Sequence, residues 1–239
     1  MNRKSFAIGN WKMNGTTADL PAIQEIAQAA KVASSGVALC LPATLLNAAR
    51  DTMCLGGQDC HANDAGAHTG DIAAPMLADA GADMVIVGHS ERRADHGETD
   101  QIVAAKVKAG WAAGLTVILC IGETEDQYRG GQTLDVLASQ IAGSLPEGAT
   151  PDNTIIAYEP VWAIGTGLTP GIDEIAKTHA FIRSKLPTAD LSILYGGSVN
   201  ADNARDIFAL ADVDGGLVGG ASLTAEKFIP IIQALEANP

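Results

Sequence analysis

Short apolar runs of four to six residues recur eight times along the chain. The clearest are DMVIVG at 83–88 and TVILCI at 116–121, which contain many β-branched residues and no regular alternation with polar ones. Such runs are typical of strands that are buried on both faces, as in a parallel sheet. We therefore expect strands at 5–10, 37–41, 53–58, 83–88, 116–121, 154–159, 192–195 and 213–218.

Segments with helical periodicity lie between the apolar runs. Near the end of the chain, Phe228 and Ile231 begin a spacing that puts apolar side chains on one face of a helix, which Thr224 would cap. Thr169 and Pro170 form a suitable N-cap and first-turn pair for another helix. Helices are expected at 17–33, 43–51, 73–80, 98–113, 132–145, 169–186 and 201–209, and after Thr224.

Eight strand–helix units in 239 residues match a (β/α)8 barrel of ordinary size. The competing α/β fold is an open, doubly wound sheet, which would carry a glycine-rich phosphate fingerprint after its first strand. The chain has GNWKMNG at that point instead, with a lysine and no GxGxxG. No linker, charge block or low-complexity segment divides the chain. We therefore expect one (β/α)8 barrel domain over residues 1–239.

The chain is strongly acidic, with a formal net charge of −13. This charge argues against nucleic acids and anionic membrane surfaces as partners, although a small anionic substrate can still bind at a locally positive site. The N-terminal segment lacks the apolar core of a signal peptide, and the sequence has no stretch of 18 consecutive apolar residues. The sequence therefore predicts a soluble, cytoplasmic protein.

The four cysteines have no paired spacing, and in the cytosol they are expected to be reduced thiols. Cys54, Cys60, His61 and His68 are close enough in sequence to be considered as a metal set. Their spacing matches no zinc pattern, so no metal site is expected.

The stretch AYEPVWAIGTG at 157–167 concentrates several chemical signals. The sixth predicted strand ends at Glu159, and Pro160 stops the strand because it has no N–H for the ladder. The next four residues are too apolar for an ordinary solvated loop, and a Gly-Thr-Gly turn follows them. A carboxylate at a strand end, followed by an apolar flap with a glycine hinge, suggests a base under a water-excluding lid. The alternative is a buried strand with a tightly packed loop.

The carboxyl ends of barrel strands converge on one face and build the active site. Asn10 and Lys12 follow the first strand, and this position favours a functional lysine over a solvated surface one. His89 follows the fourth strand and opens HSERR. A lone histidine is more often structural, but a histidine at a helix N-terminus is favoured in its neutral form and can then donate a hydrogen bond.

Paired glycines follow the last two predicted strands, at 196–197 and 219–220. Each pair leaves backbone N–H groups unobstructed and is expected to precede a helical segment, which is the usual barrel phosphate site. The alternative is two tight turns. One base, one neutral polariser, one cation and a phosphate cradle suit proton abstraction next to the carbonyl of a small sugar phosphate.

Six motifs carry a resemblance to the triosephosphate isomerase family: NWKMNG at 10–15, GHSERR at 88–93, CIGE at 120–123, AYEPVWAIGTG at 157–167, YGGSV at 195–199 and LVGGASL at 217–223. They stand in the family's order and cover nearly the whole chain. The resemblance implies a TIM barrel that forms a homodimer and interconverts dihydroxyacetone phosphate and D-glyceraldehyde 3-phosphate through an enediolate, without a cofactor. A sister isomerase for a four-carbon ketose phosphate, such as erythrulose phosphate, and a catalytically silent phosphometabolite-binding barrel are the alternatives.

The resemblance also implies roles for individual residues. Glu159 is the base, His89 the neutral electrophile and Lys12 the electrostatic stabiliser, while Asn10 assists and Glu91 pairs with the lysine. Thr69 is expected to reach into the site of the partner subunit, on a loop where His68 stands in place of an aromatic residue common in the family. The implied substrate and phosphate contacts are Asn10, Lys12, Gly165, Ser198, Leu217, Gly219 and Gly220.

Overall fold

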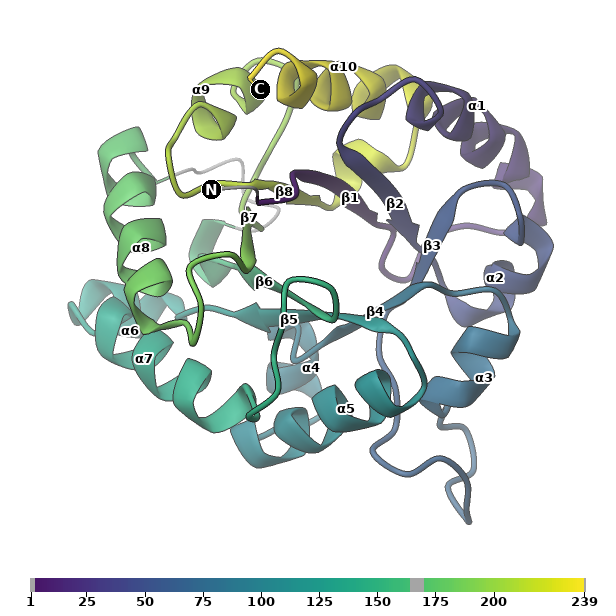
Figure 1. Cartoon of the computed structure of the whole chain (residues 1–239), viewed down its shortest axis with the longest axis horizontal. Coiled ribbons are helices and arrows are strands. Elements are labelled where there is room, and N and C mark those ends of the chain that lie inside the picture. Colours follow the sequence, from purple (N-terminus) through teal and green to yellow (C-terminus); the bar gives the residue numbers. More distant parts are fainter. Residues whose placement is uncertain (1–2, 164–169, 239) are drawn as a thin grey trace.

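The computed structural model describes residues 3–163 and 170–238, which form a closed barrel of parallel strands surrounded by helices (Figure 1). Each strand pairs with the next one along the chain, and β8 pairs with β1. This order confirms the predicted (β/α)8 barrel. The strands are β1 (Phe6–Asn10), β2 (Gly36–Cys40), β3 (Cys54–Gly57), β4 (Met84–Val87), β5 (Thr116–Ile121), β6 (Thr154–Tyr158), β7 (Ser192–Tyr195) and β8 (Gly215–Val218).

Strand β8 begins later than predicted, at Gly215. Gly215 has a φ of +124°, and a Cβ at this position would overlap the backbone of Phe6. Glycine is therefore required where β8 approaches β1. The close approach of β8 to β1 requires glycine at the start of the strand. For this reason the start of β8 does not have the composition typical of a strand.

The helices alternate with the strands and cover the outside of the barrel (Figure 1). Among the described residues, no helix combines the length and the apolar character needed to cross a membrane. The α-helices are α1 (Leu20–Ala30), α2 (Ala43–Ala49), α3 (Ala74–Asp79), α4 (Ser90–Asp95), α5 (Asp100–Ala112), α6 (Glu125–Arg129), α7 (Thr133–Ser144), α8 (Ile172–Lys185), α9 (Ala204–Phe208) and α10 (Ala225–Glu236). The short 3-10 helices are η1 (Thr17–Asp19), η2 (Val161–Ala163) and η3 (Gly220–Ser222).

Some helix boundaries differ from the predicted ones. Gly171, not Thr169, is the N-cap of α8, and Pro170 lies before the helix; Thr169 itself lies outside the described residues. Thr224 occupies the N-cap position of α10, but its side chain makes no capping hydrogen bond. Helix α6 was not predicted, although its capping box is present in the sequence, where Thr124 starts a T-x-x-Q pattern.

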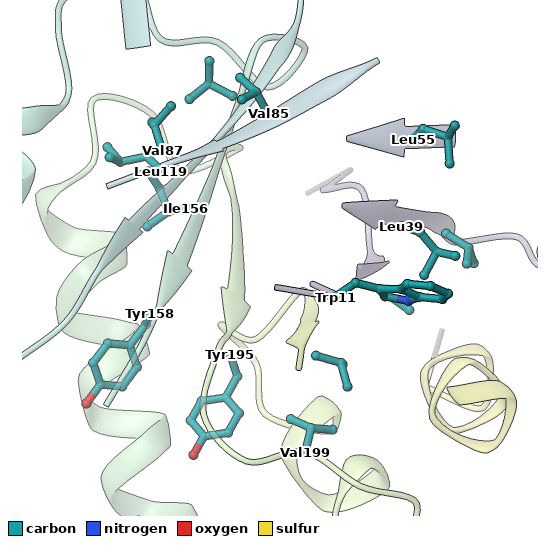
Figure 2. Close-up of a cluster of buried hydrophobic side chains, with 14 of the residues drawn as sticks. Trp11, Leu39, Leu55, Val85, Val87, Leu119, Ile156, Tyr158, Tyr195 and Val199 are labelled. Atoms are coloured by element: carbon teal, nitrogen blue, oxygen red, sulfur yellow. The ribbon is translucent and has the colours of Figure 1, made fainter. Parts of the chain in front are cut away.

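Apolar side chains of the strands are buried on both sides of the barrel wall. Residues such as Ile118 and Leu194 fill the inside, whereas Leu119 and Ile156 point outward and pack under the helices (Figure 2). Alternation along a strand sends successive side chains to opposite faces, and here both faces are apolar. This double burial is the reason that the strands appear in the sequence as continuous apolar runs.

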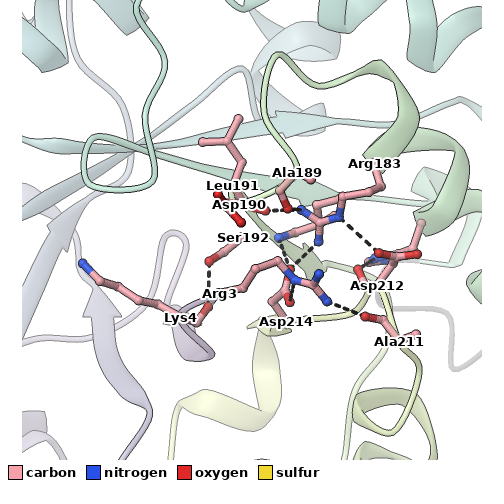
Figure 3. A network of polar contacts seen from close by, with 12 residues as sticks. Arg3, Lys4, Arg183, Ala189, Asp190, Leu191, Ser192, Ala211, Asp212 and Asp214 are labelled. Carbon is pink, nitrogen blue, oxygen red and sulfur yellow. Dashed lines mark hydrogen bonds and ion pairs between the residues drawn. The ribbon is translucent and has the colours of Figure 1, made fainter. Parts of the chain in front are cut away.

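A network of hydrogen bonds and ion pairs connects the amino ends of several strands (Figure 3). Asp214, just before β8, accepts hydrogen bonds from Arg3 Nε at 2.6 Å, from Arg183 at 2.6 Å and from the N–H of Ile193 at 2.8 Å. Arg183 also donates to Asp212 at 3.1 Å. The network joins β1, β7, β8 and α8 at the end of the barrel opposite to the predicted site.

Candidate active site

A cavity of about 300 Å³ opens where the carboxyl ends of the strands meet. This volume lies at the small end of the range for small-molecule sites and suits a compact substrate. Gly165, which the sequence also placed in the site, lies outside the described residues. The predicted site residues that line the cavity are Asn10, Lys12, His89, Glu159, Ser198, Leu217, Gly219 and Gly220.

Glu159 directly follows β6 and is only 2% exposed. Its Oε1 accepts a hydrogen bond from His89 Nε2 at 2.7 Å, and its Oε2 accepts one from the N–H of Ser90 at 3.0 Å. Burial favours the neutral acid, but His89, Ser90 and Lys12 together outweigh it and hold the pKa of Glu159 below its ordinary value. The side chain is therefore ionised near neutral pH, as a general base must be.

His89 is the N-cap of α4, and its Nδ1 accepts a hydrogen bond from the N–H of Glu91 at 3.2 Å. An accepting Nδ1 leaves the ring proton on Nε2, which faces Glu159. Burial favours the neutral ring, but the Glu159 carboxylate outweighs it, so the pKa of His89 is raised above its ordinary value. The helix N-terminus predicted a neutral His89 side chain, but the contact with Glu159 favours the protonated form. The sequence did not reveal this contact.

Lys12 follows β1 in a left-handed backbone conformation, with a φ of +52°. Such a conformation costs a residue with a Cβ about 1–3 kcal/mol. The side chain of Asn10 accepts a hydrogen bond from the Lys12 N–H at 3.0 Å and stabilises the turn. Glu91 does not line the cavity, but its Oε1 lies 2.5 Å from Lys12 Nζ and its Oε2 lies 3.6 Å from His89 Nδ1. Glu91 therefore links the cation to the histidine.

The two glycine pairs serve different purposes. A Cβ on the second glycine of the 196–197 pair would overlap the Tyr195 hydroxyl group, and one on the first would lie 3.0 Å from Glu159 Cγ. This pair is therefore required by close packing beside Glu159. At the 219–220 pair a Cβ would have at least 3.8 Å of room, so packing does not explain these glycines. Their backbone groups border the cavity instead.

Only the 219–220 pair leads directly into a helical turn, which is η3. The helix predicted after 196–197 is present as α9, but it begins only at Ala204, because the Asn200 side chain accepts hydrogen bonds from the next residues and forms a separate turn before it. Within this loop, Ser198 Oγ donates to the carbonyl of Ala163 at 2.7 Å. Ser198 thus ties the loop after β7 to the segment after β6.

The predicted lid begins with the short helix η2, whose Trp162 side chain is held by neighbouring side chains. Trp162 Nε1 donates to Glu123 Oε1 at 3.0 Å, and its ring stacks on Tyr128 with the centroids 4.2 Å apart. Glu123 is completely buried and also accepts a hydrogen bond from the Tyr158 hydroxyl at 3.2 Å. Burial raises the pKa of Glu123 despite these bonds. The rest of the predicted lid lies outside the described residues.

A family model described as triosephosphate isomerase matches residues 5–235. The curated triosephosphate isomerases of Ruegeria pomeroyi and Ruegeria sp. (strain TM1040) are 55% and 53% identical to this chain; each alignment covers 98% of this chain, and 98% and 99% of the relative. The crystal structure of triosephosphate isomerase from Bartonella henselae superposes with a TM-score of 0.90 at 45% identity, over 97% of this chain and 98% of that chain.

The chain belongs to the triosephosphate isomerase family. Membership in this family confirms the resemblance carried by the six motifs, and the closed barrel is the fold that the resemblance implied.

Asn14 and Glu123 were not singled out from the sequence. Asn14 lines the cavity and donates from Nδ2 to the carbonyl of Trp11 at 2.7 Å. Glu123 holds the start of the predicted lid. Both lie within motifs of the triosephosphate isomerase family, NWKMNG and CIGE, and an acidic residue two positions beyond a buried strand was an available signal for the second.

Thr69 lies on the loop between β3 and α3, which projects away from the barrel (Figure 1). It is exposed and does not line the cavity of its own chain. This placement neither brings Thr69 to the site nor opposes a role in a second subunit, so its predicted contact with a partner's site stays a prediction.

The same loop holds the one group of potential metal ligands found among the described residues, which is His61, His68 and Asp71. Their ligand atoms lie within 4.8 Å of one another, but none of the three lines the active-site cavity. Cys54 and Cys60, which the sequence put beside the two histidines, do not join this group. The thiol of Cys60 donates instead to the carbonyl of Lys106 at 3.7 Å.

Proposed function

We propose that this chain interconverts dihydroxyacetone phosphate and D-glyceraldehyde 3-phosphate through an enediolate, with Glu159 as the base. One observation carries the proposal. In a cavity of about 300 Å³, the buried carboxylate of Glu159 is held ionised 2.7 Å from His89 Nε2, and Lys12 lines the same cavity. A protein that only binds phosphometabolites has no need for a base held in this way.

The reaction begins when the Glu159 carboxylate takes a proton from carbon 1 of the ketone. The electron pair of that C–H bond forms a double bond between carbons 1 and 2, and the carbonyl oxygen gains the negative charge. His89 Nε2–H donates to this oxygen and moves protons between the two oxygens, while the Lys12 ammonium group stabilises the charge. Glu159 then returns the proton to carbon 2. The two carbons exchange oxidation states, so the step balances without an added oxidant, reductant or cofactor.

The phosphate group is proposed to bind at the 219–220 glycine pair. Gly219 and Gly220, the N-cap and the first residue of η3, line the cavity and can offer backbone N–H groups. Ser198 and Leu217 also line the cavity. The part assigned to Gly165 by the resemblance remains a prediction.

The four-carbon sister isomerase is not favoured. The family model and the relatives named above are triosephosphate isomerases, and the cavity is small. The direct test is a coupled assay of glyceraldehyde 3-phosphate and erythrulose phosphate turnover, with Glu159→Gln as the inactive control. We expect turnover of the triose by the wild-type protein and loss of that turnover, with a normal circular dichroism spectrum, in Glu159→Gln. Preferred turnover of the tetrose, or triose turnover by the variant, contradicts the proposal.

A homodimer is part of the proposal. Met13, which follows β1, is 97% exposed, and Met76, in α3, is 55% exposed. Exposed apolar side chains together with a projecting loop favour an interface, and a second copy of the chain would bring Thr69 to the partner's site. Sedimentation of the wild type and of Met76→Glu tests this: we expect a dimer that the variant weakens. Residence in the cytoplasm likewise remains a proposal.

A further inference from the structure

Strand β5 continues beyond the end of its neighbour β4. The two strands pair as far as Val87 and Leu119, whereas β5 runs to Ile121 and Gly122 follows it. Alternate residues of a strand offer their backbone groups to opposite neighbours. Gly122 therefore presents its N–H and C=O on the side that β4 has left, where these groups need other partners.

Gln140 of α7 supplies both partners. Its Oε1 accepts a hydrogen bond from the Gly122 N–H at 2.8 Å, and its Nε2 donates one to the Gly122 C=O at 3.0 Å. The side-chain amide thus takes the place of the C=O and N–H groups that a longer β4 would have provided. Leu137 and Ile141 of the same helix are buried, and α7 packs against β5, so the backbone that carries Gln140 is itself fixed.

Gly122 lies directly against the residue proposed as the base. A Cβ on Gly122 would overlap the backbone carbonyl of Glu159, so no side chain fits between the two segments. On either side of Gly122, the carbonyls of Ile121 and Glu123 accept hydrogen bonds from Glu159 at 2.8 Å and from Val161 at 3.2 Å. The backbone of Glu159 therefore rests on a short segment whose other edge is bound by the carboxamide of α7.

We propose that Gln140 is a positioning residue for the proton-transfer step, acting through Gly122 on the backbone of Glu159. Gln140 does not line the active-site cavity, so its effect on the reaction is indirect. Misplacing a reacting group by about 1 Å can cost on the order of 10²-fold in rate. Loss of the Gln140 hydrogen bonds loosens only one edge of the segment that supports Glu159, so we expect the carboxylate to move by less than about 1 Å. The expected decrease in rate is therefore smaller, on the order of tenfold. This inference rests on the proposed function of Glu159.

The main test replaces Gln140 with methionine, which has a similar length and makes neither hydrogen bond. In Gln140→Met, kcat is expected to fall on the order of tenfold while KM stays within about twofold, because the phosphate side of the cavity is untouched. The deuterium isotope effect at the transferred position is expected to rise, since proton transfer becomes slower relative to the other steps. Gln101→Met, the same substitution at an exposed position of α5, is the matched control and is expected to keep wild-type values.

A second variant, Gln140→Glu, keeps the hydrogen-bond acceptor for the Gly122 N–H and loses the donor to its carbonyl. It is expected to lower kcat and raise the isotope effect in the same direction, and it provides the test if the methionine variant does not fold. All variants are assayed well below their unfolding temperatures, so that loss of folded protein does not contribute to kcat.

A wild-type kcat in a folded Gln140 variant overturns the inference, as does a loss that falls on KM with an unchanged isotope effect. Glu159→Gln, assayed in parallel, separates this inference from the proposed function. If Glu159→Gln keeps its activity, the assignment of the base fails. If it is inactive while Gln140→Met behaves like Gln101→Met, only the positioning role fails.

Discussion

At the amino end of the barrel, Asp214 is bound by Arg3 and Arg183, whereas at the carboxyl end Glu159 faces His89. The guanidinium groups stay protonated at any pH that the fold survives, so the charge of Asp214 is matched permanently. The pKa of His89 is raised by the Glu159 carboxylate despite the opposing effect of burial, and Glu159 borders a cavity. The first arrangement fixes a charge in place, while the second lets a proton enter and leave.

The cationic residues near the two carboxylates also differ in backbone strain. Among the described residues other than glycine, only Lys12 and Asp51 have a positive φ, and Lys12 lines the cavity that holds Glu159. Neither arginine that binds Asp214 is strained in this way. At Lys12, the strained conformation places a charged side chain at the cavity. Substitutions at the amino end should therefore change stability, and those at the carboxyl end should change activity.

Asp214→Ala tests the amino end and should have the largest effect on stability. The variant removes the carboxylate that Arg3 and Arg183 share, and breaking a buried ion pair costs about 3–5 kcal/mol of unfolding free energy. Activity per folded molecule should not change. Urea unfolding and kcat measure the two effects. Asp152→Ala, which removes an exposed pair with Lys4, is the control, and it should leave the unfolding free energy nearly unchanged. Equal losses in the two variants would contradict the comparison.

Lys12→Met tests the carboxyl end. Loss of one preorganised group that stabilises developing negative charge costs about 10²–10³-fold in rate. We expect kcat/KM to fall by that factor, while the unfolding free energy changes little because the pair with Glu91 is partly exposed. Lys31→Met, at an exposed position after α1, provides the control. A stability loss as large as that of Asp214→Ala would erase the distinction between the two ends.

Glu236→Gln should have the smallest effect on stability, and the difference from the wild type should shrink as the pH falls. Although desolvation acts in the opposite direction, hydrogen bonds from Ser34 and Ser35 lower the pKa of Glu236 from 4.5 to about 2. A carboxylate with a lowered pKa stabilises the fold above its ordinary pKa, and this contribution is lost as the pH falls from about 4.5 towards 2. The variant should therefore lose less stability than the wild type between about pH 7 and about pH 3. Glu226→Gln, in the first turn of the same helix, should behave like the wild type. Parallel curves for Glu236→Gln and the wild type would contradict this assignment.

The existence of the barrel elements was predictable because each strand is buried on both faces and so appears as an apolar run. Their boundaries depend on contacts between distant segments. Gly215 starts β8 because Phe6 leaves no room for a Cβ, and nothing near Gly215 in the sequence shows this. The start of α9 is set by the Asn200 side chain, which competes with the helix for backbone N–H groups.

The residues at the strand ends were predictable from the convergence of barrel strands, and Asn10, Lys12, His89 and Glu159 do line one cavity. Their electrostatic states were not predictable. The raised pKa of His89 follows from its contact with Glu159, which lies 70 residues further along the chain. The hydrogen bonds between Gln140 and Gly122 depend on β4 ending before β5, and only the folded barrel reveals this difference between the strand ends.

The central claim is that Glu159 carries the proton between the two carbons. Its most direct test is the exchange of the carbon-bound proton with D2O, followed by NMR, together with kcat for Glu159→Asp. The shorter side chain withdraws the carboxylate by about 1 Å, so both rates should fall on the order of 10²-fold, with unchanged unfolding free energy. Wild-type rates of exchange and turnover in the folded variant would show that another group is the base.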